Sequence, residues 1–359
     1  MNLIGEHTDY NDGYALPAAI DLELRIALVP SGDSRVEITL AESGERAAFD
    51  LDAIGSAHGR WIDYVAGTAW SLGEAGVPTR GFRGVLGSTI PTSAGLSSSA
   101  AIELASAWAL TEPPGGGVDP MTLARLCQRA ENRYVGVNCG LMDQAAEALG
   151  RDGEAILLDF RTLDWRPVPL PLERCGIVVC DTGSPRRLSA SQYNARRAQC
   201  EAAVAVLAES DPSIRALRDV TPDMLASIRG RLDEETFRRC EHVVRENERV
   251  LRTVAALEAR DLETVGRCLV ESHESLRDLY EVSSPELDAM VEIALSTLGV
   301  IGSRMTGAGF GGCTVTLVER GAEDRLREAV LSEYPARTGL TPRVFAVEPV
   351  RGAGLLPAG

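Results

Sequence analysis

A cluster of polar side chains near the start of the chain offers the first chemistry. Glu6, His7, Asp9 and Tyr10 fall within five residues, next to Gly5. Carboxylates accept hydrogen bonds, whereas an imidazole and a phenol can both donate and accept them. This mixture suits a polyhydroxylated ligand, because every hydroxyl group needs a partner. A His-x-Asp metal pair, which would need further ligands, and a solvated polar turn are the alternatives.

Three serines stand where a helix is predicted to begin. The segment 91–103 reads PTSAGLSSSAAIE, with small residues that lead into a helical pattern from Leu96. Free backbone N–H groups and the positive end of the helix dipole attract phosphate at such a place. Serine hydroxyls can cap the helix, bind phosphate oxygens or ligate Mg²⁺. A plain N-cap needs fewer serines, so the pattern favours a phosphate site.

Two acidic residues are candidates for phosphoryl-transfer chemistry. Glu131 falls on the helix predicted after Asp119 and Pro120, and Asp143 falls at the start of the next helix. One carboxylate to hold Mg²⁺ and one to act on a substrate hydroxyl is what this chemistry requires. Taken singly, each residue also fits an ordinary surface acid, so the prediction depends on the whole set.

A second glycine-rich segment, GAGFGG at 307–312, satisfies the pattern G-x-G-x-x-G. A dinucleotide-binding loop must follow a strand and open a helix. Here the strand-like sequence CTVTLV follows instead, so we expect no NAD site. The glycines predict either a close approach of the backbone to another loop or to ligand, or a purely structural turn.

Composition excludes several classes of function. The 359 residues suit two domains, and 52 acidic against 36 basic residues give a net charge of −16, which disfavours nucleic acid. Every basic residue is arginine, so Schiff-base lysine chemistry and a Walker A loop are excluded. The eight cysteines form no Cys-x-x-Cys pair, and the four histidines are dispersed. Neither a metal cluster nor a disulfide framework is therefore expected.

We expect a cytoplasmic chain that does not associate with membranes. No apolar run approaches the roughly 20 residues that a spanning helix needs, and the start of the chain lacks the pattern of a signal peptide. Scattered thiols fit a reducing compartment.

The elements that would position these residues form a mixed α and β pattern. Strands are predicted within 14–40, at 81–91, 155–160 and 176–182 and near 313–318 and 343–350. Helices are predicted at 60–76, 96–110, 120–134 and 139–149 and along much of 189–298. Strict β-α-β alternation is absent, which favours the α+β class over a doubly wound sheet. The proline-spaced segment 161–173 is predicted to be a connector, which divides the chain into domains 1–165 and 166–359.

Four segments together resemble the galactokinase branch of the GHMP small-molecule kinases. NLIGEHTDYNDGYALPAAI (2–20) resembles the galactokinase signature, and AGLSSSAAIE (94–103) resembles the superfamily phosphate loop. AENRYVGVNCGLMDQ (130–144) resembles the segment with the catalytic acid, and SRMTGAGFGGCTVTLV (303–318) resembles the third motif. The phosphate loop alone would not exclude homoserine or mevalonate kinases.

The resemblance implies a fold, an activity and ligands. The fold would be the two-domain GHMP kinase fold, with mixed sheets and helices and an active site in the cleft between the domains. The activity would be ATP-dependent phosphorylation of D-galactose at the anomeric hydroxyl, giving galactose 1-phosphate. ATP, Mg²⁺ and a small sugar would be the ligands, and we expect a monomer.

The resemblance also implies roles for individual residues. Asp143 would act as the base on the C1 hydroxyl, and Ser99 and Glu131 would hold Mg²⁺. The sugar would be bound by Glu6, His7, Asp9, Tyr193 and the backbone of Gly140. ATP would be bound by Trp61, against the adenine, and by the phosphate loop of Ser93, Ala94, Gly95, Leu96, Ser97, Ser98 and Ser99. None of these roles needs a lysine.

Two departures from the family pattern stand out. The family usually has more glycine where Thr92, Ser93 and Ala94 stand. It also has a Pro-Gly-Arg-Val lead-in before the position of Asn2, where this sequence has only Met1. The lead-in arginine, which lies against the catalytic acid, and the first strand would then be missing. We expect the true start to lie upstream; a chain without that arginine would lose on the order of 10²–10³ in rate.

Two other functions stay open at this point. One is a related sugar kinase for arabinose or a sugar acid, because a few side chains can accommodate such differences. The other is a catalytically impaired, sugar-binding regulator, which the missing arginine favours and the intact Asp143 and serine segment disfavour. ATP turnover with galactose, compared with a panel of other sugars, would distinguish them.

Overall fold

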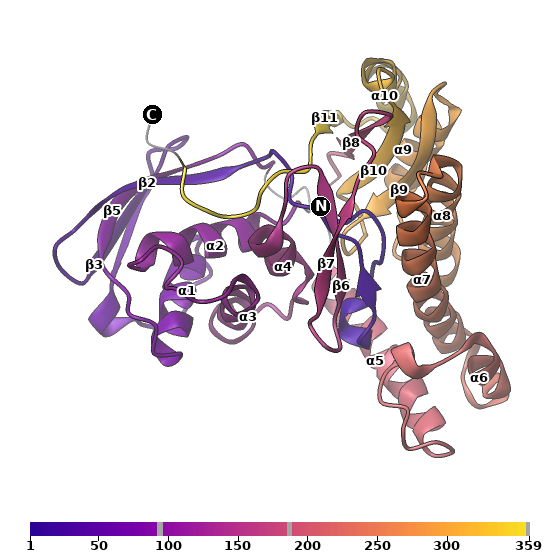
Figure 1. Cartoon of the computed structure of the whole chain (residues 1–359), viewed down its shortest axis with the longest axis horizontal. Coiled ribbons are helices and arrows are strands. Elements are labelled where there is room, and N and C mark those ends of the chain that lie inside the picture. Colours follow the sequence, from indigo (N-terminus) through magenta and orange to yellow (C-terminus); the bar gives the residue numbers. More distant parts are fainter. Residues whose placement is uncertain (92–95, 185–188, 357–359) are drawn as a thin grey trace. The chain divides into compact units, whose positions relative to one another are not determined.

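The computed structural model describes residues 1–91, 96–184 and 189–356. The described chain divides into two compact units, whose elements are labelled in Figure 1. Unit 1 contains Met1–Ala18, Gly153–Glu348 and Leu96, and unit 2 contains 19–91, 97–152 and 349–356. Each unit has its own sheets, helices and hydrophobic core.

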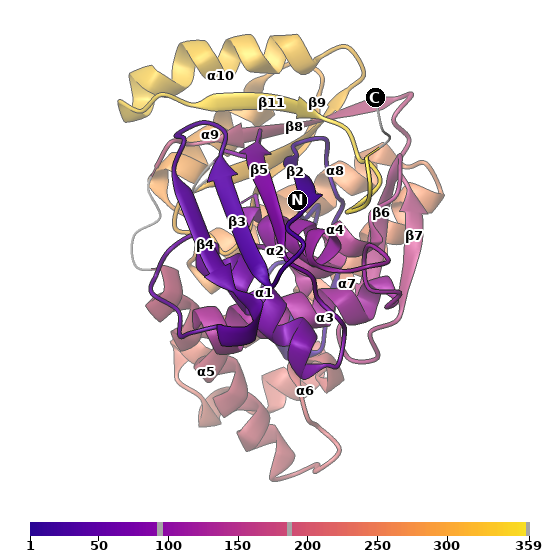
Figure 2. The same ribbon diagram turned by 90° about the vertical axis from the view of Figure 1, so that its left-hand side faces the viewer.

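Unit 2 is a four-stranded sheet covered on one face by helices. Its strands are β2 (Leu24–Pro30), β3 (Arg35–Leu40), β4 (Arg46–Asp50) and β5 (Phe82–Ser88), in the order β2-β5-β3-β4. Figure 2 shows these strands side by side, with α1 (Ile62–Glu74), α2 (Ser98–Leu110), α3 (Pro120–Ala130) and α4 (Met142–Leu149) behind them. Only β3 and β5 pair in parallel. The core between sheet and helices includes Val36, Ile38, Leu72, Phe82, Leu104 and Leu110.

Unit 1 contains two antiparallel sheets. The smaller one has β1 (Tyr14–Ala15), β6 (Glu154–Asp159) and β7 (Trp165–Pro169), in the order β1-β6-β7. The larger one has β8 (Cys175–Asp181), β9 (Val300–Thr306), β10 (Cys313–Glu319) and β11 (Arg343–Val347), in the order β11-β8-β10-β9. All seven residues of β8 are buried, as expected of a central strand.

The helices of unit 1 are α5 (Ser189–Ala208), α6 (Pro222–Ser227), α7 (Glu234–Glu258), α8 (Leu262–Ser275), α9 (Pro285–Ser296) and α10 (Glu323–Thr338). Side chains of α5, α6 and α7 form one apolar core, and α9 and α10 form another against β8 and β10. Short 3₁₀ turns occur at Asp9–Asn11, Leu51–Ala53, Leu217–Asp219 and Arg229–Arg231, and π-helical turns at Glu131–Val135 and Leu276–Tyr280.

The structure confirms several predictions that were made from the local sequence. The Asp119 carboxylate accepts a hydrogen bond from the Thr122 N–H at 3.0 Å and caps α3, with Pro120 at the first helical position. The 307–312 segment connects β9 to its antiparallel neighbour β10, so it has no Rossmann context. The predominantly antiparallel sheets confirm the α+β class.

The predicted connector at 161–173 is wrong, because Trp165–Pro169 forms strand β7. Its prolines are tolerated because β7 is an edge strand, where a missing N–H breaks no central ladder. The opening segment joins unit 1 because β1 pairs with β6. The compact units are therefore not contiguous and differ from the division at 165/166, which stays a prediction for the two kinase domains.

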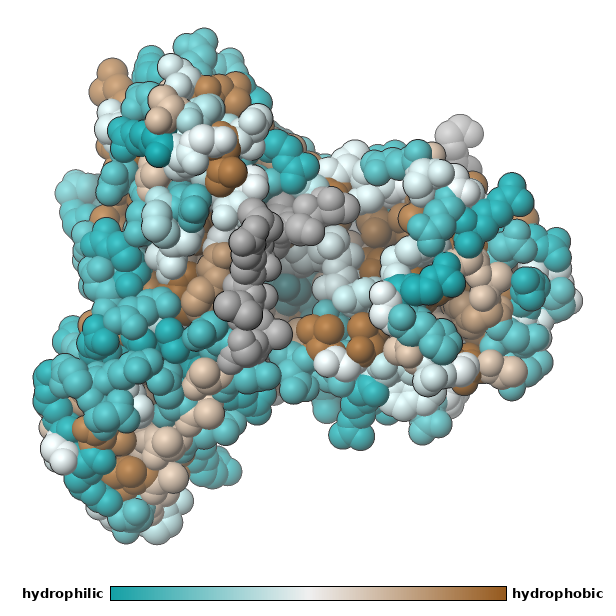
Figure 3. Space-filling view, turned by 180° about the vertical axis from the view of Figure 1, so that it is seen from behind, coloured by the Kyte–Doolittle hydropathy of each residue, from teal (hydrophilic) through white to brown (hydrophobic). Residues whose placement is uncertain are grey.

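Three further features concern the polarity of the surface, the search for membrane-spanning helices and the state of the cysteines. On the face shown in Figure 3, apolar residues form small groups among polar ones. None of the helices in the described ranges has both the length and the apolar composition needed to cross a membrane. All eight cysteines, which lie within the described chain, are free thiols, and seven are buried.

Candidate active site

The carboxylate of Glu6 is anchored to the end of strand β9. Glu6 is 2% exposed, and its Oε1 accepts hydrogen bonds from the Gly307 N–H at 2.8 Å and the Thr306 hydroxyl at 3.2 Å. The same oxygen lies 3.3 Å from Nη2 of the fully buried Arg304, which also donates to the Leu3 carbonyl. Two segments 300 residues apart in sequence are thus joined at this carboxylate.

The glycine segment 307–312 makes close backbone approaches, as the sequence predicts. The Gly307 N–H reaches Glu6, and a Cβ on Gly309 would lie 2.2 Å from the Val282 carbonyl oxygen. Gly309 also has a φ of +85°, which side chains rarely adopt. Close packing inside unit 1 therefore accounts for these glycines.

Helix α7 holds the opening segment through buried polar side chains. The Gly5 N–H donates to Oε1 of Glu246 at 3.1 Å, and the Tyr14 N–H donates to Oδ1 of Asn247 at 2.9 Å. Burial alone would raise the pKa of Glu246, but Arg249 and other nearby cations lower it to about 2. The Glu246 acceptor therefore stays ionised.

His7 is a neutral imidazole whose orientation is fixed by two tyrosines. Burial, together with the charge of His242, lowers the pKa of His7 to about 3. Its Nδ1 lies 2.9 Å from the Tyr10 hydroxyl, which lies 2.6 Å from the Tyr280 hydroxyl. The rings of His7 and Tyr280 also pack with centroids 4.6 Å apart. Asp9 follows in the half-buried 3₁₀ turn Asp9–Asn11.

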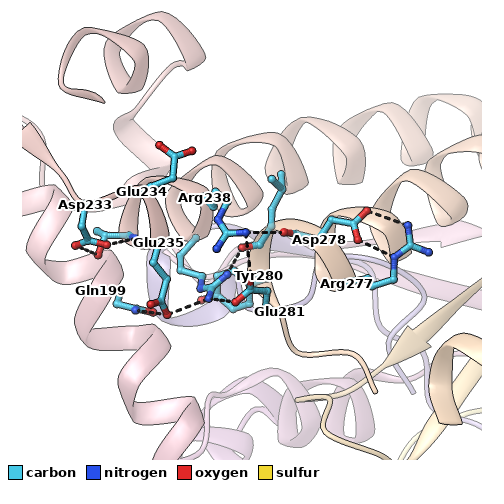
Figure 4. Close-up of polar contacts among 12 residues, drawn as sticks. Gln199, Asp233, Glu234, Glu235, Arg238, Arg277, Asp278, Tyr280 and Glu281 are labelled. Carbon is cyan, nitrogen blue, oxygen red and sulfur yellow. Dashed lines mark hydrogen bonds and ion pairs between the residues drawn. The ribbon is translucent and has the colours of Figure 1, made fainter. Parts of the chain in front are cut away.

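Arginines position the turn that carries Tyr280. Arg196 donates to the Tyr280 carbonyl at 2.8 Å. Figure 4 shows Arg238 next to Glu281 and Asp278, and its Nη1 lies 2.9 Å from the Glu281 carboxylate. Sequence reasoning missed Tyr280, because no spacing rule relates it to its hydrogen-bond partner Tyr10, which lies 270 positions earlier in the sequence.

In unit 2, the two predicted metal ligands lie together. Ser99, in the first turn of α2, lies close enough to the carboxylate of Glu131, in the π-helical turn that follows α3, to influence the pKa of that carboxylate. Burial raises the pKa of Glu131, and the charge of Asp143 raises it further, whereas the thiol of Cys139 and the hydroxyl of Ser99 lower it. Ser99, Glu131 and Asp143 therefore belong to one local cluster.

Asp143 occupies the second position of α4, where the positive end of the helix dipole favours a negative charge. Its side chain is half-buried, and its charge acts on Glu103, Glu131 and Glu147. Gly140, also half-buried, follows Cys139, whose thiol donates to Oε2 of Glu131 at 3.2 Å. The neighbourhood of Asp143 is thus rich in carboxylates.

Helix α2 begins at Ser98, two residues later than the sequence predicts. Ser97 occupies the N-cap position with a left-handed φ of 59°, and its side chain makes no capping hydrogen bond to the described residues of the helix. The plain N-cap alternative is therefore not supported for Ser97. Leu96 is buried, Ser98 is exposed, and Ser93, Ala94 and Gly95 lie outside the described residues.

The two aromatic residues that are predicted to contact ligands, Trp61 and Tyr193, belong to the start of α1 and to α5. The Trp61 indole N–H donates to Oε1 of Glu45 at 3.0 Å, so the ring is held at the start of α1 beside the turn between β3 and β4. Tyr193 lies on α5, but its side chain lies outside the description.

Sequence reasoning also missed two buried residues near Glu131, one of the predicted metal ligands. Glu103 and Gln144 are 0% and 1% exposed, and each ends one of the segments that carry the family resemblance. Burial and the charge of Glu131 raise the pKa of Glu103 to about 10. Their place within the motifs was the signal that could have identified them.

Comparison with known proteins identifies the family. The chain matches three family models: GHMP kinases N terminal domain over 63–151, GHMP kinases C terminal over 253–336 and the galactokinase galactose-binding signature over 1–30. A galactokinase from Roseiflexus sp. (strain RS-1) is 45% identical over 354 residues, which cover 99% of this chain and 90% of that protein. The chain belongs to the galactokinase family.

Other galactokinases agree in length and in structure. That of Chloroflexus aggregans is 44% identical over 342 residues, covering 95% of this chain and 87% of that protein. The crystal structure of Lactococcus lactis galactokinase complexed with galactose matches with a TM-score of 0.93 and 36% identity, covering 99% and 92% of the two chains. Methanococcus jannaschii mevalonate kinase, at 20% identity and a TM-score of 0.70, shares the fold. The expected GHMP kinase fold is confirmed.

The galactokinase signature covers Glu6, His7 and Asp9, and the N-terminal kinase match covers Ser99, Glu131 and Asp143. The side-chain oxygen atoms of Ser99 and Glu131, the predicted metal ligands, are of the type that Mg²⁺ prefers. Within the described ranges, no group of three or more His, Cys, Asp or Glu side chains could hold a metal. A galactokinase needs no such group if ATP phosphates and water complete the shell.

Proposed function

We propose that this chain transfers the γ-phosphoryl group of ATP to the anomeric hydroxyl of D-galactose, giving galactose 1-phosphate and ADP. The observation that carries the proposal is the galactokinase signature over residues 1–30, which separates galactokinases from other kinases of the same fold. The 45% identity to a galactokinase over nearly the whole chain supports the same substrate. The arabinose, sugar-acid and regulator alternatives have no comparable support.

Asp143 is the proposed base. Its half-buried carboxylate accepts the proton of the C1 hydroxyl as that oxygen forms a bond to the γ-phosphorus of ATP. The bond between the γ-phosphorus and the bridging oxygen breaks, and ADP leaves with the electron pair.

Ser99 and Glu131 are the proposed Mg²⁺ ligands. Ser99 lies close enough to Glu131 to influence the pKa of its carboxylate, so two oxygen-bearing side chains of the kind that suits a hard cation lie near each other. When bound, Mg²⁺ neutralises charge on the phosphate oxygens. The phosphates are assigned to the backbone and hydroxyl groups of 93–99, and the adenine is assigned to Trp61.

The sugar hydroxyls are assigned to Glu6, His7, Asp9, Tyr193 and the Gly140 backbone. Anchoring of Glu6 by Gly307 and of His7 by Tyr10 supports this assignment, because rigid polar groups lose little entropy on binding. All proposed ligand groups come from one chain, so we also propose a monomer. Use of ATP and eight free thiols support a cytoplasmic location.

The proposal is tested by offering the purified chain MgATP with galactose, arabinose, galacturonate or glucose. A coupled assay measures ADP, and ³¹P NMR identifies the product. The expected result is ADP formation with the highest kcat/KM for galactose, and a phosphate signal split by the anomeric proton. A higher kcat/KM for another sugar, or galactose binding without phosphorylation, would overturn the proposal.

A further inference from the structure

The side chain of Gln144 links the carboxylate of Glu131, one of the two proposed metal ligands, to the buried carboxylate of Glu103. Gln144 directly follows Asp143 on α4 and is 1% exposed. Its Nε2 donates to Oε2 of Glu131 at 2.9 Å and to Oε2 of Glu103 at 3.1 Å. One amide group thus connects α2, the turn after α3 and the first turn of α4.

The same amide is placed at a cost in stability. Among the described residues, Oε1 of Gln144 and Oε1 of Glu103 are buried without any hydrogen-bond partner. A buried polar atom without a partner is destabilising, so the oxygen of Gln144 offsets part of the stability that its N–H groups contribute. Such an arrangement calls for an explanation other than stability.

The amide of Gln144 has a specific effect on Glu131, to which it donates one hydrogen bond. Its carboxylate is buried next to acidic neighbours, so it needs donors to hold one orientation. Cys139 supplies a weak S–H donor to Oε2, whereas Gln144 supplies an amide donor to the same oxygen. These bonds constrain the Glu131 side chain from the side of α4.

We propose that Gln144 is a positioning residue for phosphoryl transfer: its amide orients Glu131 for the metal and ties it to the turn of α4 that carries Asp143. The inference rests on the proposed function, because it takes Glu131 as a metal ligand and Asp143 as the base. Gln144 itself touches neither the metal nor the sugar in this assignment.

The test replaces Gln144 with methionine, which has similar length and volume but no amide. The matched control is Gln128→Met on α3, because the Gln128 amide donates to the Cys139 carbonyl at 3.3 Å and has no bond to either carboxylate. Binding of Mn²⁺ in the presence of ATP, without sugar, is measured by electron paramagnetic resonance. Thermal unfolding and steady-state kinetics are measured on the same samples.

For Gln144→Met we expect Mn²⁺ to bind about 10–100-fold more weakly, which is typical when the partner of a metal ligand is removed. We expect kcat to fall, KM for galactose to stay within about twofold, and the unfolding midpoint to fall only modestly, because the variant loses two donors to buried carboxylates but also loses an unpartnered oxygen. Gln128→Met keeps wild-type Mn²⁺ binding. Gln144→Glu, which loses the donors and adds a negative charge, binds Mn²⁺ no better than Gln144→Met.

Equal Mn²⁺ affinity in Gln144→Met and wild type would overturn the inference, and so would an equal loss in Gln128→Met. A Gln144→Met chain that does not fold would also overturn it, because the amide would then be required by the fold itself and not by the position of Glu131 alone. Failure of the proposed function is seen separately, as a wild-type chain that binds Mn²⁺ and ATP but does not phosphorylate galactose.

Discussion

Buried ionisable side chains decide the chemistry of both units. His7 is neutral, Glu246 is ionised and Glu103 is protonated near neutral pH, because each responds differently to burial and to its neighbours. The proposed roles therefore require acceptors and donors whose protonation is set by the fold.

Asp143→Ala is expected to lower kcat about 10²–10⁴-fold, the usual contribution of a general base. Galactose affinity, measured by calorimetry, stays within about threefold, because the proposed sugar ligands remain. Asp119→Ala is the control, since Asp119 is an exposed cap on α3 of the same unit. Unchanged turnover in Asp143→Ala would remove this residue from the base role.

Glu103→Gln is expected to stabilise the protein above pH 4.5. The pKa of Glu103 is raised from 4.5 to about 10, mainly by burial, so the folded state holds a proton that the unfolded chain loses above pH 4.5. Its contribution to stability is therefore complete below pH 4.5 and declines as the pH rises toward 10. Denaturant unfolding from pH 4 to 10 should show a smaller pH dependence in the variant; an identical profile would contradict a raised pKa.

At the scale of elements, close approaches between a helix and a strand depend on particular glycines. A Cβ on Gly266 of α8 would lie 2.1 Å from the Ile301 carbonyl oxygen of β9, whereas Gly73 of α1 has nothing within 4 Å. The same substitution should therefore have opposite effects in the two helices.

Gly266→Ala is expected to destabilise the protein by about 1–3 kcal/mol through overpacking. Gly73→Ala should stabilise it by about 0.5–1 kcal/mol, because alanine is the better helix former and fits the open space. Urea unfolding midpoints of the two variants give the comparison. A shift of the same sign in both would show that helix propensity, not the contact with β9, dominates at Gly266.

Local sequence signals predicted most helices and strands, but they did not predict the contacts between segments that are far apart in the sequence. The Asp119 cap, the helix around Glu131 and the strand after the glycine segment follow from nearby residues, and the structure contains them. The prolines of β7 led to the wrong prediction of a connector at 161–173, because the pairing of an edge strand depends on tertiary contacts that the local sequence does not show. Arg304 and Tyr280 could not be assigned to the opening segment, since their contacts span about 300 residues.

At the scale of the whole molecule, ligand binding should stabilise the fold. A ligand that binds only the folded chain adds about 2.7 kcal/mol at a hundredfold excess over its Kd. We expect galactose to raise the melting temperature, and Asp9→Asn to reduce this shift if Asp9 binds a sugar hydroxyl. Asp33→Asn, which changes an exposed acid elsewhere, is the control. An equal galactose shift in all three chains would contradict the role of Asp9.

The bond between Glu6 and Gly307 also orders events during synthesis. A ribosome makes residue 6 early, yet the groups that anchor its carboxylate, Arg304, Thr306 and Gly307, emerge only when most of the chain has been translated. A nascent polypeptide released before that point lacks these hydrogen-bond donors, so the carboxylate of Glu6 reaches its native surroundings only late in synthesis.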